Sequence, residues 1–175
     1  MSKVSEVAIV QTIMADYAAV DQAGKLNIIG GTVAVVSQLP SNDALASFAL
    51  IVSVTVPPTH YGSTCRIDVV LEDASGEPVY VSGLVAGAPP QPITFQQSAT
   101  FDRPRLSPDL TGLGDYLPSR VHTVVTFPPG LPLPKDRGYQ WRVIIDDETR
   151  DDWRLPFVVS AQPPPPSNPP ASEPI

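Results

Sequence analysis

The sequence predicts an all-β protein, an immunoglobulin-like antiparallel β-sandwich of about nine strands that is followed by a proline-rich C-terminal tail. Three observations predict this class. Apolar residues repeat with period two in almost every apolar segment, turn-forming residues separate these segments, and no segment has a convincing helical period. A small closed barrel satisfies the same alternation and is the alternative architecture.

The first two strands are expected over residues 7–19 and 25–36. The turn between them contains Gly24, which can adopt the positive φ that a tight hairpin requires. Gly30 and Gly31 lie inside the second strand, where paired glycines are typical of a bulge or of close backbone approach.

The middle of the chain supplies five more segments with strand-like alternation. They are expected over residues 48–56, 65–71, a short stretch that starts near Val79, 92–101 and 121–127. Cys65, the single cysteine, falls on the apolar side of its strand, so we expect a buried thiol and no disulfide.

The last two strands are expected over residues 139–145 and 153–160. Pro156 indicates that the final strand lies at a sheet edge, because proline cannot donate a hydrogen bond to a neighbouring strand. The alternation of apolar residues predicts a core between two sheets that contains Phe48, Val69, Tyr139, Trp141, Leu155 and Phe157.

Two regions do not fit the strand pattern. Residues 102–120 form a long loop, with one helical turn expected at 107–110, and loops of this length are functional or mobile. Residues 162–175 contain seven prolines in fourteen residues, which predicts an extended, polyproline-like segment. The expected organisation is therefore a sandwich domain over residues 1–161 and a tail over 162–175.

Composition excludes several classes of protein. The formal net charge is −7, with 11 Lys and Arg against 18 Asp and Glu, which argues against binding to nucleic acid. The N-terminus does not resemble a signal peptide, and the longest low-polarity run, residues 44–56, is too short for a membrane span. We expect a cytoplasmic protein, or one released as part of an assembly made in the cytoplasm.

Two pairs of motifs are familiar. One is Ala-Asp-Tyr-Ala at 15–18, followed by Gly-Lys-Leu-Asn-Ile-Ile-Gly-Gly at 24–31; the other is Gly-Tyr-Gln-Trp-Arg at 138–142, followed by Trp-Arg-Leu-Pro-Phe at 153–157. Together they resemble a family of small uncharacterised bacterial proteins that look like single β-sandwich domains. The resemblance implies the fold and supplies no functional residue.

The densest charge feature is the acidic hairpin, which we define as residues 146–152, with five acids in seven residues. A solvated acidic turn is the favoured interpretation, because Arg150 lies among the acids and the spacing matches no calcium-binding loop. The alternative is a calcium site, whose candidate ligands are Asp146, Asp147, Glu148, Asp151 and Asp152.

No motif for catalysis is present in the sequence. His60 lies in a loop-like segment and His122 is expected on the solvent or loop side of a strand, with nothing in their spacing that requires metal or acid–base chemistry. Five of the eleven basic residues fall between positions 103 and 137, where solvated loop cations are favoured over a basic patch; they are Arg103, Arg105, Arg120, Lys135 and Arg137.

These observations favour a non-catalytic module for protein interaction or structural assembly, with no cofactor. Residues 48–56 and 7–14 are apolar on both faces, more than one sandwich core can bury, and this indicates a protein partner or self-association. The tail is expected to contact another chain. The alternative function is a calcium- or ligand-binding sandwich that uses the loops 102–120 and 146–152.

Overall fold

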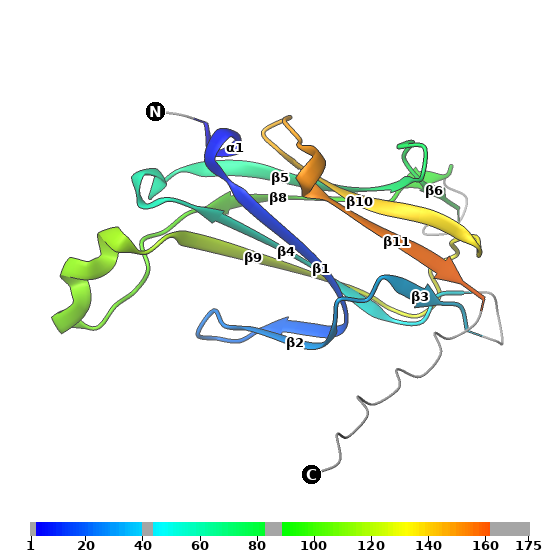
Figure 1. The fold of residues 1–175 in the computed structure, drawn as a ribbon, viewed down its shortest axis with the longest axis horizontal. Coiled ribbons are helices and arrows are strands. Elements are labelled where there is room, and N and C mark those ends of the chain that lie inside the picture. The colour runs from blue at the N-terminus through cyan, green and yellow to red at the C-terminus, as the bar shows by residue number, and fades with distance from the viewer. Residues whose placement is uncertain (1–2, 40–43, 83–88, 162–175) are drawn as a thin grey trace, which may run out of the picture.

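A computed structural model describes residues 3–39, 44–82 and 89–161, and within them two sheets, antiparallel except for one short parallel pair, pack face to face (Figure 1). The four-stranded sheet has the order β2-β1-β4-β9 and the five-stranded sheet the order β3-β11-β10-β5-β8. The strands of the first are β1 (Ile9–Val20), β2 (Leu26–Gly31), β4 (Phe48–Val56) and β9 (Ser119–Phe127). Those of the second are β3 (Val35–Ser37), β5 (Thr64–Asp73), β8 (Thr94–Thr100), β10 (Arg137–Ile145) and β11 (Arg154–Ser160).

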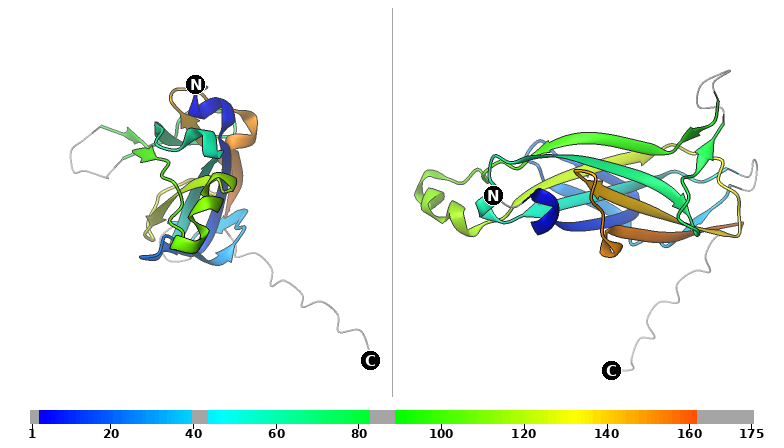
Figure 2. Two further views of the ribbon diagram at one scale, coloured as in Figure 1. Left: turned by 90° about the vertical axis from the view of Figure 1, so that its left-hand side faces the viewer. Right: turned by 90° about the horizontal axis from the view of Figure 1, so that it is seen from above.

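The remaining elements are short. Strands β6 (Tyr80–Val81) and β7 (Gln91–Pro92) pair with each other, and α1 (Val4–Val7) precedes β1. The 3-10 helices among the described residues are η1 (Pro58–His60), η2 (Pro108–Tyr116) and η3 (Asp151–Trp153). The η2 segment projects from one end of the sandwich and the β6–β7 ribbon from the other (Figures 1 and 2).

The main core lies between the two sheets, as the alternation predicted. Alternate residues of β4, β5 and β10 point inward, with Leu50, Leu71 and Trp141 fully buried. Of the six expected core residues, Leu155 alone is only half-buried, at the margin of this core. The all-β class and the sandwich are confirmed, and each sheet ends in edge strands instead of closing into a barrel.

The expectation of one strand over residues 25–36 is wrong. Gly30 and Thr32 have φ of +64° and +66°, a left-handed conformation that interrupts an extended strand. The chain therefore leaves the four-stranded sheet after β2 and joins the five-stranded sheet as β3, which runs parallel to the end of β11. The glycine pair does mark close backbone approach, because a Cβ at Gly30 would overlap the Asp16 carboxylate.

Three smaller expectations also change. The strand near Val79 is only the two-residue β6, and the single turn expected in 102–120 is the nine-residue η2. Strand β11 is not an edge strand, because β3 pairs with residues 158–160; Pro156 lies just before that pairing begins.

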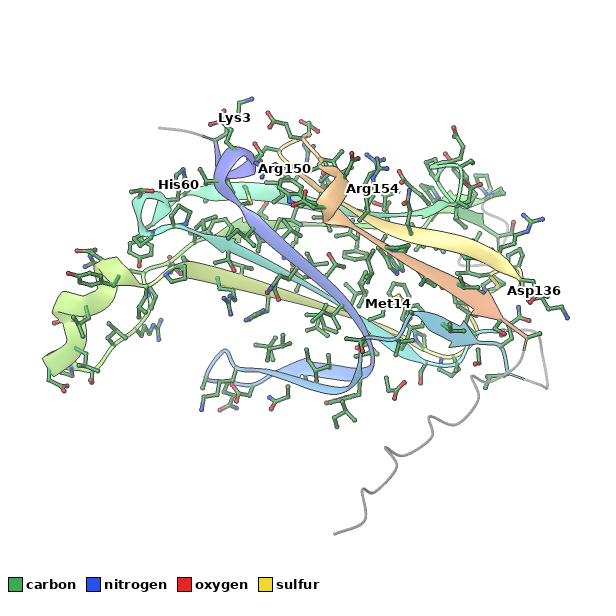
Figure 3. The ribbon with its side chains drawn as sticks, in the orientation of Figure 1. Lys3, Met14, His60, Asp136, Arg150 and Arg154 are labelled. Atoms are coloured by element: carbon green, nitrogen blue, oxygen red, sulfur yellow. The ribbon has the colours of Figure 1, made fainter. Side chains whose placement is uncertain are left out.

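A second, smaller core lies on the outer face of the four-stranded sheet. Strand β1 bends sharply near Met14, so that its second half and β2 form a hairpin that runs beside and beneath the sheet (Figures 1 and 3). Ala18 and Leu26 of this hairpin pack on Ile51 of β4 and Val124 of β9. The outer face of 48–56, which the sequence assigned to a partner, is thus covered in part by the chain itself.

Two findings concern the rest of the chain. None of the helices in the described ranges is both long and apolar enough to cross a membrane. The proline-rich tail, residues 162–175, lies outside the described residues, so the expected division into domain and tail stays a prediction.

Candidate interaction surface

The outward face of the β1–β2 hairpin, residues 16–31, carries a pair of exposed large apolar side chains. Tyr17 and Ile29 are direct cross-strand partners, and their exposed fractions are 53% and 64%. Val20 and Ile28 lie on the opposite face, the one that Ala18 and Leu26 pack against the sheet, and are partly exposed at its margin. An exposed apolar pair of this kind is a candidate site of contact.

Strand β2 is also an open sheet edge. The amide of Asp21 donates to the carbonyl of Lys25 at 2.9 Å, which makes this pair a hydrogen-bonded one. Hydrogen-bonded and non-bonded pairs alternate along an antiparallel ladder. The backbone groups of Asn27 and Ile29 therefore face β1, and those of Leu26 and Ile28 face outward. Within the described ranges, no strand pairs with that outer edge.

Two carboxylates of the acidic hairpin form a hydrogen bond and an ion pair with Arg66 on β5. The carboxylate of Asp146 accepts a hydrogen bond from the backbone amide of Arg66 at 2.9 Å, and Asp147 pairs with the Arg66 guanidinium. The hydrogen bond to Asp68, and then the hydrogen bond to Asp147 and the charge of Asp147, raise the pKa of Arg66. Positive φ at both aspartates, 49° and 68°, makes the turn tight and points the two carboxylates toward β5.

The other acids of the hairpin point elsewhere. Glu148 pairs with Lys3 at 2.9 Å, which lowers the pKa of the carboxyl, and Asp151 lies 3.9 Å from Arg154. Arg150 donates to the carbonyl of Ser5 and stacks 4.8 Å over the Trp153 ring (Figure 3). Among the residues with described positions, no three His, Cys, Asp or Glu side chains are placed to hold a metal ion.

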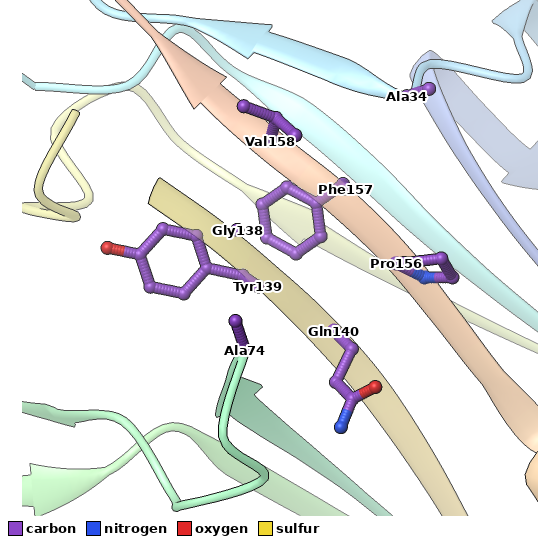
Figure 4. Close-up of a pocket in the computed structure, with 8 residues that line it drawn as sticks. All are labelled: Ala34, Ala74, Gly138, Tyr139, Gln140, Pro156, Phe157 and Val158. Carbon is purple, nitrogen blue, oxygen red and sulfur yellow. The ribbon is translucent and has the colours of Figure 1, made fainter. Parts of the chain in front are cut away.

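An apolar groove of about 410 Å³ lies on the outer face of β10 and β11 (Figure 4). Its floor is Gly138, whose lack of a side chain leaves the hollow, and Ala74, Pro156 and Val158 form its walls. The groove contains no unpaired charged group and is a second, weaker candidate for contact with a partner.

The two histidines, His60 and His122, lie in different elements and have different neighbours. His60 lies in the short turn η1 between two strands, as its loop-like composition suggested, and its side chain is buried. His122 is half-buried on the outer face of β9, opposite in direction to Val121, and shares a 2.7 Å hydrogen bond with Ser53. Burial, and then the charge of Arg120, lower the pKa of His122. No acid–base pair is formed between them.

Two of the basic residues between positions 103 and 137, Arg103 and Arg120, contact different groups. Arg103 forms an ion pair with Asp115 and lies 5.7 Å over the Tyr61 ring, whose hydroxyl donates to the carbonyl of Gly114 at 2.6 Å. Arg120 donates to Thr55 Oγ1 at 3.0 Å. The Tyr61 bond and the Arg103–Asp115 pair hold η2 near the residue that follows η1, whereas the Arg120 bond joins β9 to β4.

Cys65 is buried, as expected, and burial raises the pKa of its thiol to about 11. The sequence did not predict the open edge of β2, although a signal was present. Residues 26–31 contain no charged residue and no proline, the two features that protect edge strands.

A protein-family model matches residues 11–160, and its description is a family of unknown function, DUF6941. The matched range extends from the start of β1 to the end of β11, so it includes both sheets and the β1–β2 hairpin. No curated protein matches the chain.

Proposed function

Because the chain belongs to this family of unknown function, we propose its role from its own surface: it is a non-catalytic module for protein interaction or structural assembly. One observation carries the proposal. Two large apolar side chains, Tyr17 and Ile29, are exposed together on the outward face of the β1–β2 hairpin, beside the open edge of β2. Burying them contributes about 25 cal/mol for each Å² removed from water, before the entropic cost of association is subtracted.

The physical arrangement supports binding more than chemistry. The hairpin presents Tyr17 and Ile29 on strands that the second core anchors, so little ordering is needed when a partner binds. The immunoglobulin-like type of sandwich, a cytoplasmic location and the absence of catalysis belong to this proposal as predictions.

The experiment is affinity purification from the native cell with two matched variants. Tyr17→Ser/Ile29→Ser removes the exposed pair on the hairpin, and Leu113→Ser/Tyr116→Ser removes an equally exposed pair on η2. We expect the hairpin variant to lose co-purifying chains, including further copies of this chain, and the η2 variant to retain them. Circular dichroism confirms that both variants are folded. Retention by the hairpin variant would show that the surface is wrong.

A further inference from the structure

We propose that the partner of the hairpin is a second copy of this chain, and that two β2 strands pair antiparallel about a two-fold axis at Ile28. This joins two four-stranded sheets into one continuous sheet. The inference rests on the proposed interaction function and adds the identity of the partner and the register of pairing.

The hydrogen-bonding groups of β2 fit this arrangement. In the extended part of β2 the outward backbone groups belong to Leu26 and Ile28, and the left-handed Gly30 ends this extended part. An antiparallel copy centred on Ile28 places Ile28 opposite Ile28, where each residue donates a hydrogen bond to the other, and brings Leu26 opposite the turn at Gly30. Addition of a strand to an open edge is a recurring mode of protein recognition.

The side chains fit the same register. The largest residue at one end of β2, Leu26, lies opposite the smallest, Gly30, and the contact is repeated on the other side of the axis. A two-fold interface uses one patch twice, so a patch that complements itself is what it requires.

Charge also favours a second copy. Each chain carries a formal charge of −7, so two copies repel unless they meet through an uncharged surface, and residues 26–31 have no ionisable group. Lys25 precedes one end of β2, while the Asp16 carboxylate lies over Gly30 at the other end. Antiparallel pairing brings the Lys25 end of each copy to the Asp16 end of the other, so unlike charges approach each other.

The test is disulfide cross-linking in the full chain. The native Cys65 is buried and its pKa is about 11, so it contributes little background. Ile28→Cys places two thiols opposite each other at the axis, within the Cα separation that a disulfide tolerates. We expect this variant to form a cross-linked dimer on mild oxidation, and the untreated protein to sediment at twice its 18.7 kDa mass at high concentration.

The control variants define the register. Asn27→Cys alone cannot bridge to itself, because residue 27 lies opposite residue 29 and its own copy is displaced by two residues, beyond about 7 Å. A mixture of Asn27→Cys and Ile29→Cys chains is expected to cross-link, whereas either variant alone is not.

The other outcomes overturn the pairing. A monomer at all concentrations, a dimer that Ile28→Cys does not cross-link, or equal cross-linking of Ile28→Cys and Asn27→Cys each contradicts it. If a different protein co-purifies through the hairpin while the chain stays monomeric, the second copy is the wrong partner and the interaction function still holds.

Discussion

At the scale of single residues, Gly30 allows the β1–β2 hairpin to form. Its φ is +64°, and the carboxylate of Asp16 occupies the space where a Cβ would lie, with the Asp16 Cγ at 2.6 Å. Any side chain therefore meets both backbone strain and a collision. Gly24 also has a positive φ, 78°, but nothing lies within 4 Å of its Cβ position.

We expect Gly30→Ala to lower the free energy of unfolding by about 1–3 kcal/mol, the usual range for a strained backbone position. Gly24→Ala carries the backbone strain without the collision and is the matched control, so its loss should be smaller. Urea denaturation of the two variants measures the difference. Equal losses at both positions would mean that Asp16 moves aside at no cost.

His122 gives the protein a specific dependence on pH. Its ordinary pKa is 6.5, and burial lowers the pKa in the folded protein, so the unfolded chain binds a proton more readily. The contribution of His122 to the free energy of unfolding is therefore fully present above about pH 6.5 and is lost as the pH drops below that value. Ser53 and Arg120 are the groups that adjoin the ring.

His122→Asn is expected to weaken this dependence. The variant keeps a polar partner for Ser53 but has no titrating group, so its stability relative to the native protein should rise as the pH falls from 8 toward 5. Chemical denaturation at several pH values tests this. Parallel curves for the two proteins would show that His122 does not titrate between the folded and unfolded states.

At the scale of elements, aromatic contacts between β10 and β11 form part of the core on the inner face of the five-stranded sheet. The Phe157 ring lies 5.7 Å from the Tyr139 ring and 6.3 Å from the Trp141 ring, all on the inward face. Leu155, two residues earlier on the same face, is only half-buried. Substitutions at Phe157 and Leu155 therefore allow a comparison between a central and a marginal position in the same core.

Phe157→Ala should cost about 3–5 kcal/mol of unfolding free energy, because it leaves a cavity between the sheets. Leu155→Ala should cost clearly less. Thermal or urea unfolding measures both. A loss below about 1 kcal/mol for Phe157→Ala would contradict the register assigned to β11.

The acidic hairpin provides a test of the calcium alternative. Its carboxylates are bonded to Arg66 and Lys3 and diverge from one another. We expect calcium to leave the melting temperature unchanged, because binding must first break these bonds. A calcium-dependent rise that Asp146→Asn/Asp147→Asn abolishes would instead establish the site.

The sequence predicted most strands of the sandwich because their alternation is a local property. It did not predict that the hairpin folds over the outer face, because that depends on contact of Ala18 with Ile51, residues far apart in the chain. The small size of Ala15, Ala18 and Ala49 lets the hairpin approach the sheet closely. These alanines were the available signal, but period-two alternation alone treats them as ordinary apolar residues.

At the scale of the whole molecule, the tail and the hairpin are separate candidates for contact. Strand β11 ends at Ser160, two residues before the tail begins at Gln162. Proline-rich segments are stiff and extended, so they lose less conformational entropy than flexible ones when they bind.

A chain that stops at Ala161 is expected to melt within a few degrees of the full chain, because both sheets and their cores precede the truncation. We expect the shortened chain to lose a contact that the tail makes with another chain. Sedimentation and affinity purification of the two lengths measure this. Unchanged association would make the tail a passive linker and leave the hairpin as the contact surface.

The parallel pairing of β3 with β11 constrains the order in which the chain can fold during synthesis. Val35 pairs with Val158, a sequence separation of 158 − 35 = 123 residues. The ribosome therefore releases β3 long before its partner, and the five-stranded sheet stays incomplete until the last strand emerges. Contacts between such distant segments form slowly. Until β10 and β11 have been made, the inward side chains of the four-stranded sheet, such as Phe127 beside Trp141, lack the residues that cover them.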